Sequence, residues 1–119
     1  NKESRTAVSY ILEKVRQNDT TDSISLATLE DTPALCMLSR IEDETYCTYL
    51  YFYDGHLKEL FMREGTSLGG QVLPAGADIM ELKDLTFSYV SNDLIRASLQ
   101  TASGEFHTFY IHIHCNATE

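Results

Sequence analysis

The sequence predicts an α+β fold in which one amphipathic N-terminal helix packs on an antiparallel β-meander of about six or seven strands. Apolar residues in the first 18 positions recur at three- and four-residue spacing, which is typical of an amphipathic helix. The rest of the chain contains strand-like segments rich in Tyr, Thr and Phe, separated by short turn sequences. Because 119 residues is a usual length for one domain, we expect a single soluble domain over residues 1–119, with the helix in 1–18 and the meander in 23–115.

The helix expected over residues 2–17 has one apolar stripe, with Tyr10 at its margin. The stripe consists of Ala7, Val8, Ile11, Leu12 and Val15. One apolar face needs one packing partner, so we expect Val8, Ile11, Leu12 and Val15 to pack on the sheet. Asn18-Asp19 is a suitable helix end, because both residues tolerate the left-handed conformation that often follows a helix.

About six or seven strands are expected from strand-forming segments and from the turn residues between them. They cover residues 23–29, 34–40, 45–53, 56–63, 85–90, 94–101 and 105–114. Glu30-Asp31-Thr32-Pro33 is predicted to be a turn, and Asp54-Gly55 is a strong hairpin signal. Residues 65–77 contain four glycines and Pro74, so a long loop is expected there.

The charge balance argues against two classes of partner. With 9 basic and 18 acidic residues the net charge is -9, whereas nucleic acids and anionic membrane surfaces attract clustered Lys and Arg. No stretch approaches the roughly 18–20 consecutive apolar residues that a membrane span needs. The longest apolar run, Tyr49–Tyr53, has the length of a strand.

His112 and His114 are the sharpest metal-site candidate. Two residues apart on a strand, they share a face with Tyr110, while His107 falls on the opposite face. A zinc site needs a third ligand, which the sequence does not supply, so we expect no metal. The carboxylates Asp78, Glu81 and Asp84 match no calcium-binding loop and are expected to form a solvated acidic stretch.

Three cysteines, Cys36, Cys47 and Cys115, form no metal-binding pattern. If the hairpin turns at Ile41-Glu42, Cys36 and Cys47 face each other at a distance that a disulfide can bridge. A longer turn removes that pairing. Two buried free thiols are the favoured alternative, because unpaired cysteine commonly behaves as a small core residue.

The sequence supplies no pattern that positions catalytic or cofactor-binding groups. No nucleophile elbow is present, and Gly69-Gly70 belongs to no phosphate-binding motif. We therefore expect no enzyme, no catalytic residue and no cofactor. An aromatic set could form a binding platform, although core packing is the default interpretation; it comprises Tyr46, Tyr49, Tyr51, Phe52 and Tyr53.

Several segments resemble the soluble ectodomains of type IV pilin-like proteins, particularly minor pseudopilins of type II secretion and competence systems. They are the helix segments RTAVSYI (residues 5–11) and KVRQND (14–19), the strand-turn-strand TYLYFYDGHLKEL (48–60), the strand LTFSY (85–89) and the final meander. The resemblance implies a non-catalytic structural subunit of a pilus or pseudopilus, with no catalytic residues to transfer. The same segments also resemble a pilin-like family of uncharacterised function.

The same resemblance implies partners and a location. In that family an apolar helical segment upstream of the domain anchors it in the cytoplasmic membrane and assembles it with other pilin-like subunits. We therefore expect an extracellular or cell-surface domain, contacts with such subunits, and no nucleic acid. The alternative is a small-ligand or peptide-binding module, because a helix on a curved sheet can enclose an apolar pocket.

Overall fold

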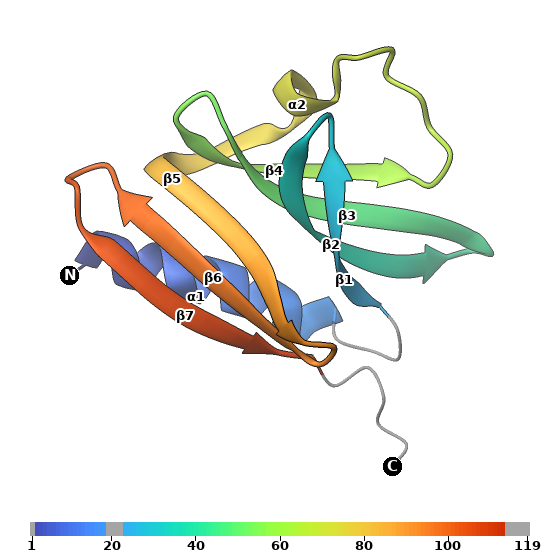
Figure 1. The fold of residues 1–119 in the computed structure, drawn as a ribbon. Helices are drawn as coiled ribbons and strands as arrows, with labels where there is room; N and C mark the ends of the chain where they lie inside the picture. Colours follow the sequence, from blue (N-terminus) through green and yellow to red (C-terminus); the bar gives the residue numbers. More distant parts are fainter. Residues whose placement is uncertain (1, 19–22, 114–119) are drawn as a thin grey trace.

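A computed structural model describes residues 2–18 and 23–113 and shows the expected α+β architecture (Figure 1). The helix α1 (Lys2–Asn18) precedes a seven-stranded antiparallel sheet whose strands lie in sequence order. The strands are β1 (Ile24–Leu29), β2 (Thr32–Ile41), β3 (Glu44–Tyr53), β4 (His56–Arg63), β5 (Ala77–Ser91), β6 (Leu94–Thr101) and β7 (Phe106–His112). A short helix, α2 (Val72–Ala75), lies between β4 and β5. The predicted fold class is confirmed.

Two-residue turns fix the order of the first four strands. Both central residues of Glu30-Asp31, Glu42-Asp43 and Asp54-Gly55 have positive φ angles, between 48° and 77°. Turns of this kind match the right-handed twist of paired strands, so each strand folds back beside its predecessor. The hairpin predicted at Asp54-Gly55 is confirmed.

Strand β5 joins two halves of the sheet. Its first residues pair with β4, and the residues from Leu82 onward pair with β6. The register shifts between Leu57 and Lys58 and again after Leu82, so the ladder is interrupted where the chain passes from one half to the other. The sheet curls enough for the Leu26 N–H on β1 to donate to the Tyr89 hydroxyl near the far end of β5, at 3.0 Å.

Helix α1 packs against the inner face of this curled sheet. Its fully or almost fully buried side chains are Ser4, Ala7, Ile11 and Val15, at intervals of three or four residues. Ala7, Ile11 and Val15 belong to one cluster with residues of both sheet halves, which include Met37 and Leu50 on one side and Ile95 and Ile111 on the other. The helix therefore supplies the apolar surface that both halves share.

A second, smaller apolar layer lies on the opposite face of β2, β3 and β4. Ala34, Tyr51 and Leu60 form its centre, and Leu68, Val72 and Leu73 of the β4–β5 connection pack over them. The Tyr51 hydroxyl donates to the Leu73 carbonyl oxygen at 2.8 Å. The connection is thus tied to the sheet instead of lying free of it.

The structure corrects several predicted details. Leu12 remains 37% exposed, because the buried stripe is centred on Ala7, Ile11 and Val15 while Val8 packs only at its edge. Pro33 lies inside β2 opposite Thr28, not in the turn, and it tolerates this position near the start of the strand. Strand β5 begins eight residues earlier than predicted, at Ala77, and the expected loop over 65–77 contains α2. Asp19 and the end of the predicted strand at His114 lie outside the described residues.

The buried stripe of α1 leads to a stability prediction. Ile11→Ala removes a side chain with no exposed surface from the shared core and should lower the free energy of unfolding by about 2–5 kcal/mol. Leu12→Ala, on the adjacent position, is the matched control and should cost less than about 1 kcal/mol. Urea unfolding of both variants measures the difference. Equal losses would mean that α1 is rotated from the position described.

Candidate functional site

A polar bridge connects the exposed side of α1 to the sheet. Glu59 on β4 accepts a hydrogen bond from the Tyr10 hydroxyl and lies 3.0 Å from the Lys14 ammonium nitrogen. The Glu59 and Lys14 side chains are only 18% and 29% exposed. Burial, and then the adjacent Glu59, raise the pKa of Tyr10, so its phenol stays protonated as the donor. This bridge fixes the rotation of α1 about its axis.

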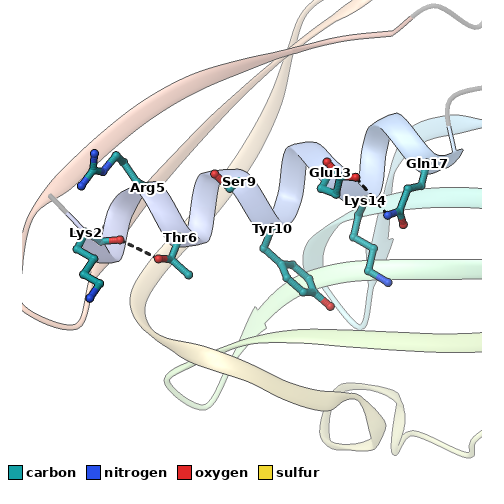
Figure 2. Close-up of a pocket in the computed structure, with 8 residues that line it drawn as sticks. All are labelled: Lys2, Arg5, Thr6, Ser9, Tyr10, Glu13, Lys14 and Gln17. Carbon is teal, nitrogen blue, oxygen red and sulfur yellow. Dashed lines mark hydrogen bonds between the residues drawn. The ribbon is translucent and has the colours of Figure 1, made fainter.

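The face of α1 beside this bridge carries an open groove of about 770 Å³. Figure 2 shows its lining side chains, all of which come from the helix: Lys2, Arg5, Thr6, Ser9, Tyr10, Glu13, Lys14 and Gln17. A groove lined by one helix lies between neighbouring side chains and does not enclose a ligand as a cleft between elements does. We call this surface the α1 groove. It suits contact with another protein surface better than capture of a small molecule.

The α1 groove differs in charge from the chain as a whole. Helix α1 carries four basic and two acidic side chains, whereas the complete chain has a net charge of -9. Lys14 is neutralised by Glu59, and Arg16 pairs with Glu13 on the helix itself. Lys2 and Arg5 therefore give the first turns of the groove a local positive character.

A smaller cleft of about 340 Å³ separates the start of α1 from β5 and the β6–β7 turn. It is lined by Lys2, Glu3, Thr6, Met80, Glu81, Leu82, Thr101 and Ala102. The Ser103 hydroxyl donates to a Glu3 carboxylate oxygen at 2.7 Å and so links the turn to the helix. Its mixed lining includes Lys2 and the two carboxylates Glu3 and Glu81.

The acidic residues considered for calcium lie along β5, and one of them, Asp78, is paired with a basic side chain. Asp78 accepts a 2.6 Å hydrogen bond from the Lys58 ammonium group, which together with nearby His56 lowers the pKa of Asp78. Lys58 is only 7% exposed, so this partner compensates a charge that would otherwise be buried alone. Glu81 lies opposite His56, and Asp84 is exposed. Residues 2–18 and 23–113 contain no group of three or more metal-type ligands.

The histidines on β7 follow the predicted alternation. His112 and Tyr110 are exposed on the outer face, while His107 shares the opposite side with Phe109 and Ile111. His114, the proposed partner of His112, lies outside the described residues. The prediction that these histidines hold no metal stays a prediction.

Cys36 and Cys47 do not face each other across β2 and β3. The turn is at Glu42-Asp43, one residue later than the turn that pairs them, so Cys36 lies opposite Tyr49 and Cys47 opposite Leu38. Diagonal neighbours of this kind are about 7–8 Å apart, beyond the usual Cα separation of a disulfide. Both thiols are free and buried, and burial together with nearby Cys47 raises the pKa of Cys36 to about 11.

The tyrosine-rich strand β3 packs into apolar clusters on both of its faces, as the core-packing interpretation predicted. Tyr51 is fully buried, Tyr49 and Tyr53 pack beside it, and Phe52 packs on the opposite face against the main cluster. Tyr46 is the exception, since it stacks on exposed Phe61 with ring centroids 5.2 Å apart. The sequence did not indicate Glu59 or Lys58 as important residues, because their partners are distant in the chain and leave no local pattern.

Burial of the two thiols predicts slow chemical modification. In a Cys115→Ser background, Cys36 and Cys47 should react with an aromatic disulfide reagent at pH 8 about a hundredfold or more slowly in the folded chain than in denaturant, because both side chains are buried away from the reagent. For Cys36 the raised pKa also lowers the fraction of reactive thiolate. A Cys36→Ala variant reports the rate for Cys47 alone. Immediate reaction of both thiols in the folded chain, or the mass of a disulfide-bonded form, would contradict the described packing.

None of the helices formed by the described residues is long and apolar enough to cross a membrane. The comparison with curated proteins and the comparison with solved structures each gave no match. Residues 2–102, which include α1 and every strand up to β6, match the family described as "Domain of unknown function (DUF4860)". The chain therefore belongs to the DUF4860 family.

Proposed function

We propose that this chain is the folded, non-catalytic part of a pilin-like structural subunit, in a type IV pilus-like filament or a type II secretion or competence pseudopilus. The observation that carries the proposal is the way in which α1 is used. Its Ala7, Ile11 and Val15 face is buried in the core, while the other side of the same helix forms the open α1 groove. One helix thus holds the fold together and remains available to a neighbouring subunit.

The attachment of α1 to the sheet supports this role. The Tyr10–Glu59–Lys14 bridge and the buried stripe hold the helix to both sheet halves. A subunit in a filament transmits load between its neighbours, and a helix that is fixed along its length is suited to that task. In the proposed protein, an apolar segment upstream of α1 anchors the domain in the cytoplasmic membrane, and the sheet lies outside the cell.

The binding-module alternative has weaker support. It requires an apolar pocket between the helix and the curved sheet, but that space is occupied by side chains of the main cluster, such as Ile11, Met37 and Leu50. The α1 groove and the smaller cleft beside β5 are both open to the surface and partly lined by charged side chains. Small-ligand sites are usually concave and mostly apolar, with few polar groups.

The proposal predicts where the full-length native protein is found and what it touches. Native protein should fractionate with membranes, and crosslinking in cells should connect it to pilin-like subunits through the α1 groove. A photo-crosslinking amino acid in place of Ser9, which is exposed in the groove, should capture such subunits. The same group in place of exposed Glu42, in the β2–β3 turn, is the matched control.

Two outcomes would contradict the proposal. Native full-length protein found free in the cytosol has no access to a pilus or pseudopilus. Crosslinking from position 9 that captures only small molecules or unrelated proteins, in a strain that assembles the filament, would favour the binding-module alternative.

A further inference from the structure

A sheet whose strands follow the sequence order has two edge strands, β1 and β7. Figure 1 shows β7 at the outer border of its half of the sheet, with β6 on one side. The backbone N–H and C=O groups on an outer edge have no partner within the sheet and can pair with another strand. The two edges of this sheet differ in whether a side chain already hydrogen-bonds to these outward backbone groups.

The β1 edge is blocked by a side chain from β5. The Ser23 carbonyl accepts a hydrogen bond from the Leu38 N–H, which places the odd-numbered residues of β1 in bonding contact with β2. Leu26 therefore belongs to the outward row, and its N–H already donates to the Tyr89 hydroxyl at 3.0 Å. A strand arriving at this edge has to displace Tyr89.

The β7 edge has no comparable block among the described residues. The Ile113 N–H donates to the Asp93 carbonyl and the Thr101 N–H to the Glu105 carbonyl, each at 2.9 Å. These two bonds lie at the two ends of the β6–β7 ladder and show that the odd-numbered residues of β7 bond to β6. The outward backbone row consists of Phe106, Thr108, Tyr110 and His112, and no hydrogen bond from residues 2–18 or 23–113 reaches it.

The composition of β7 favours pairing at this edge. The strand FHTFYIH has no acidic residue, Lys, Arg, Pro or Gly, although natural edge strands commonly use Lys or Pro to prevent association. Phe106 is 80% exposed and Tyr110 is 48% exposed. In a chain with a net charge of -9, two copies repel each other over most of their surface, and β7 is a formally uncharged strand at which their backbones can approach.

We propose that β7 is a self-association site, at which β7 of a second copy pairs antiparallel across a twofold axis beside Phe109. This register places Phe106 opposite His112 of the second copy and Thr108 opposite Tyr110 of the second copy. All four are outward-row residues, so each opposing pair exchanges two hydrogen bonds, giving about eight across the interface. The pairing is isologous and closed, since each copy offers the same strand. It does not depend on the proposed function.

The same register also brings the exposed rings together on one face. Phe106 lies diagonal to Tyr110 of the second copy, a separation that aromatic side chains can span. The two strands thereby cover the aromatic side chains that are most exposed on β7. A dimer of this kind continues the sheet from β6 and β7 of one copy into β7 and β6 of the other.

The first test is the oligomeric state of the chain. Sedimentation velocity over a range from micromolar to millimolar concentration should show a monomer–dimer equilibrium. Thr108→Pro removes an outward N–H and keeps the backbone hydrogen bonds between β6 and β7, although, like Thr108→Val, it loses the side-chain hydrogen bond to Ser98. It should weaken dimerisation about tenfold or more. Thr108→Val, which keeps the N–H, and Thr28→Pro, which places the same residue on the blocked β1 edge, should dimerise as the unmodified chain does. Circular dichroism checks that each variant is folded.

The second test reads the register directly. Amide hydrogen exchange by NMR should show that the amides of Thr108 and Tyr110 are fast at low concentration and become protected at high concentration. The amides of Phe109 and Ile111, already bonded to β6, should be protected throughout. A monomer at every concentration, a dimer that is unaffected by Thr108→Pro, or new protection confined to β1 would each overturn the proposal.

Discussion

The packing of the buried stripe of α1 against both halves of the sheet is the contact on which the other features depend. The sheet is one continuous meander, but the backbone ladder between its β1–β4 and β5–β7 parts is short and runs along the first residues of β5, where the register is interrupted. Residues of both parts belong to one apolar cluster, and Ile11, which has no exposed surface, lies within it. Removing the helix from this position would expose the inner faces of both halves at once.

Polar contacts, in addition to the buried apolar stripe, hold α1 in one orientation on the sheet. A helix with a stripe of small and medium-sized side chains can roll on a curved apolar surface, and the Tyr10–Glu59–Lys14 bridge opposes that rotation. Lys58 and Asp78 act in a similar way at the β4–β5 junction, where the ladder is irregular. These contacts explain how a helix can be held firmly along one side and leave the α1 groove open on the other, which is the property used in the proposed structural role.

Local signals predicted the parts of the fold that local physics determines. The spacing of Ala7, Ile11 and Val15 defined the helix, and Asp54-Gly55 defined a hairpin. Strand β5 was underestimated, because Asp78, Glu81 and Asp84 obscure its alternation and its partner β4 lies across a long connection. The register of β2 and β3 was left conditional on the turn, because moving a turn by one residue moves every cross-strand partner by two; the favoured alternative of two buried free thiols at Cys36 and Cys47 is confirmed. Glu59 was not indicated as a contact of Tyr10, since nothing near either residue reports a partner so far along the chain.

The central claim, that α1 is an integral part of the core and not a helix docked on a finished sheet, can be tested by native-state hydrogen exchange at increasing denaturant. The amides around Ile11 and Val15 should exchange with the same free energy as those of Ile95 and Leu99 in β6, because loss of the helix removes the surface on which β6 packs. Exchange of the α1 amides through an opening of much lower free energy, with β6 still protected, would contradict the account.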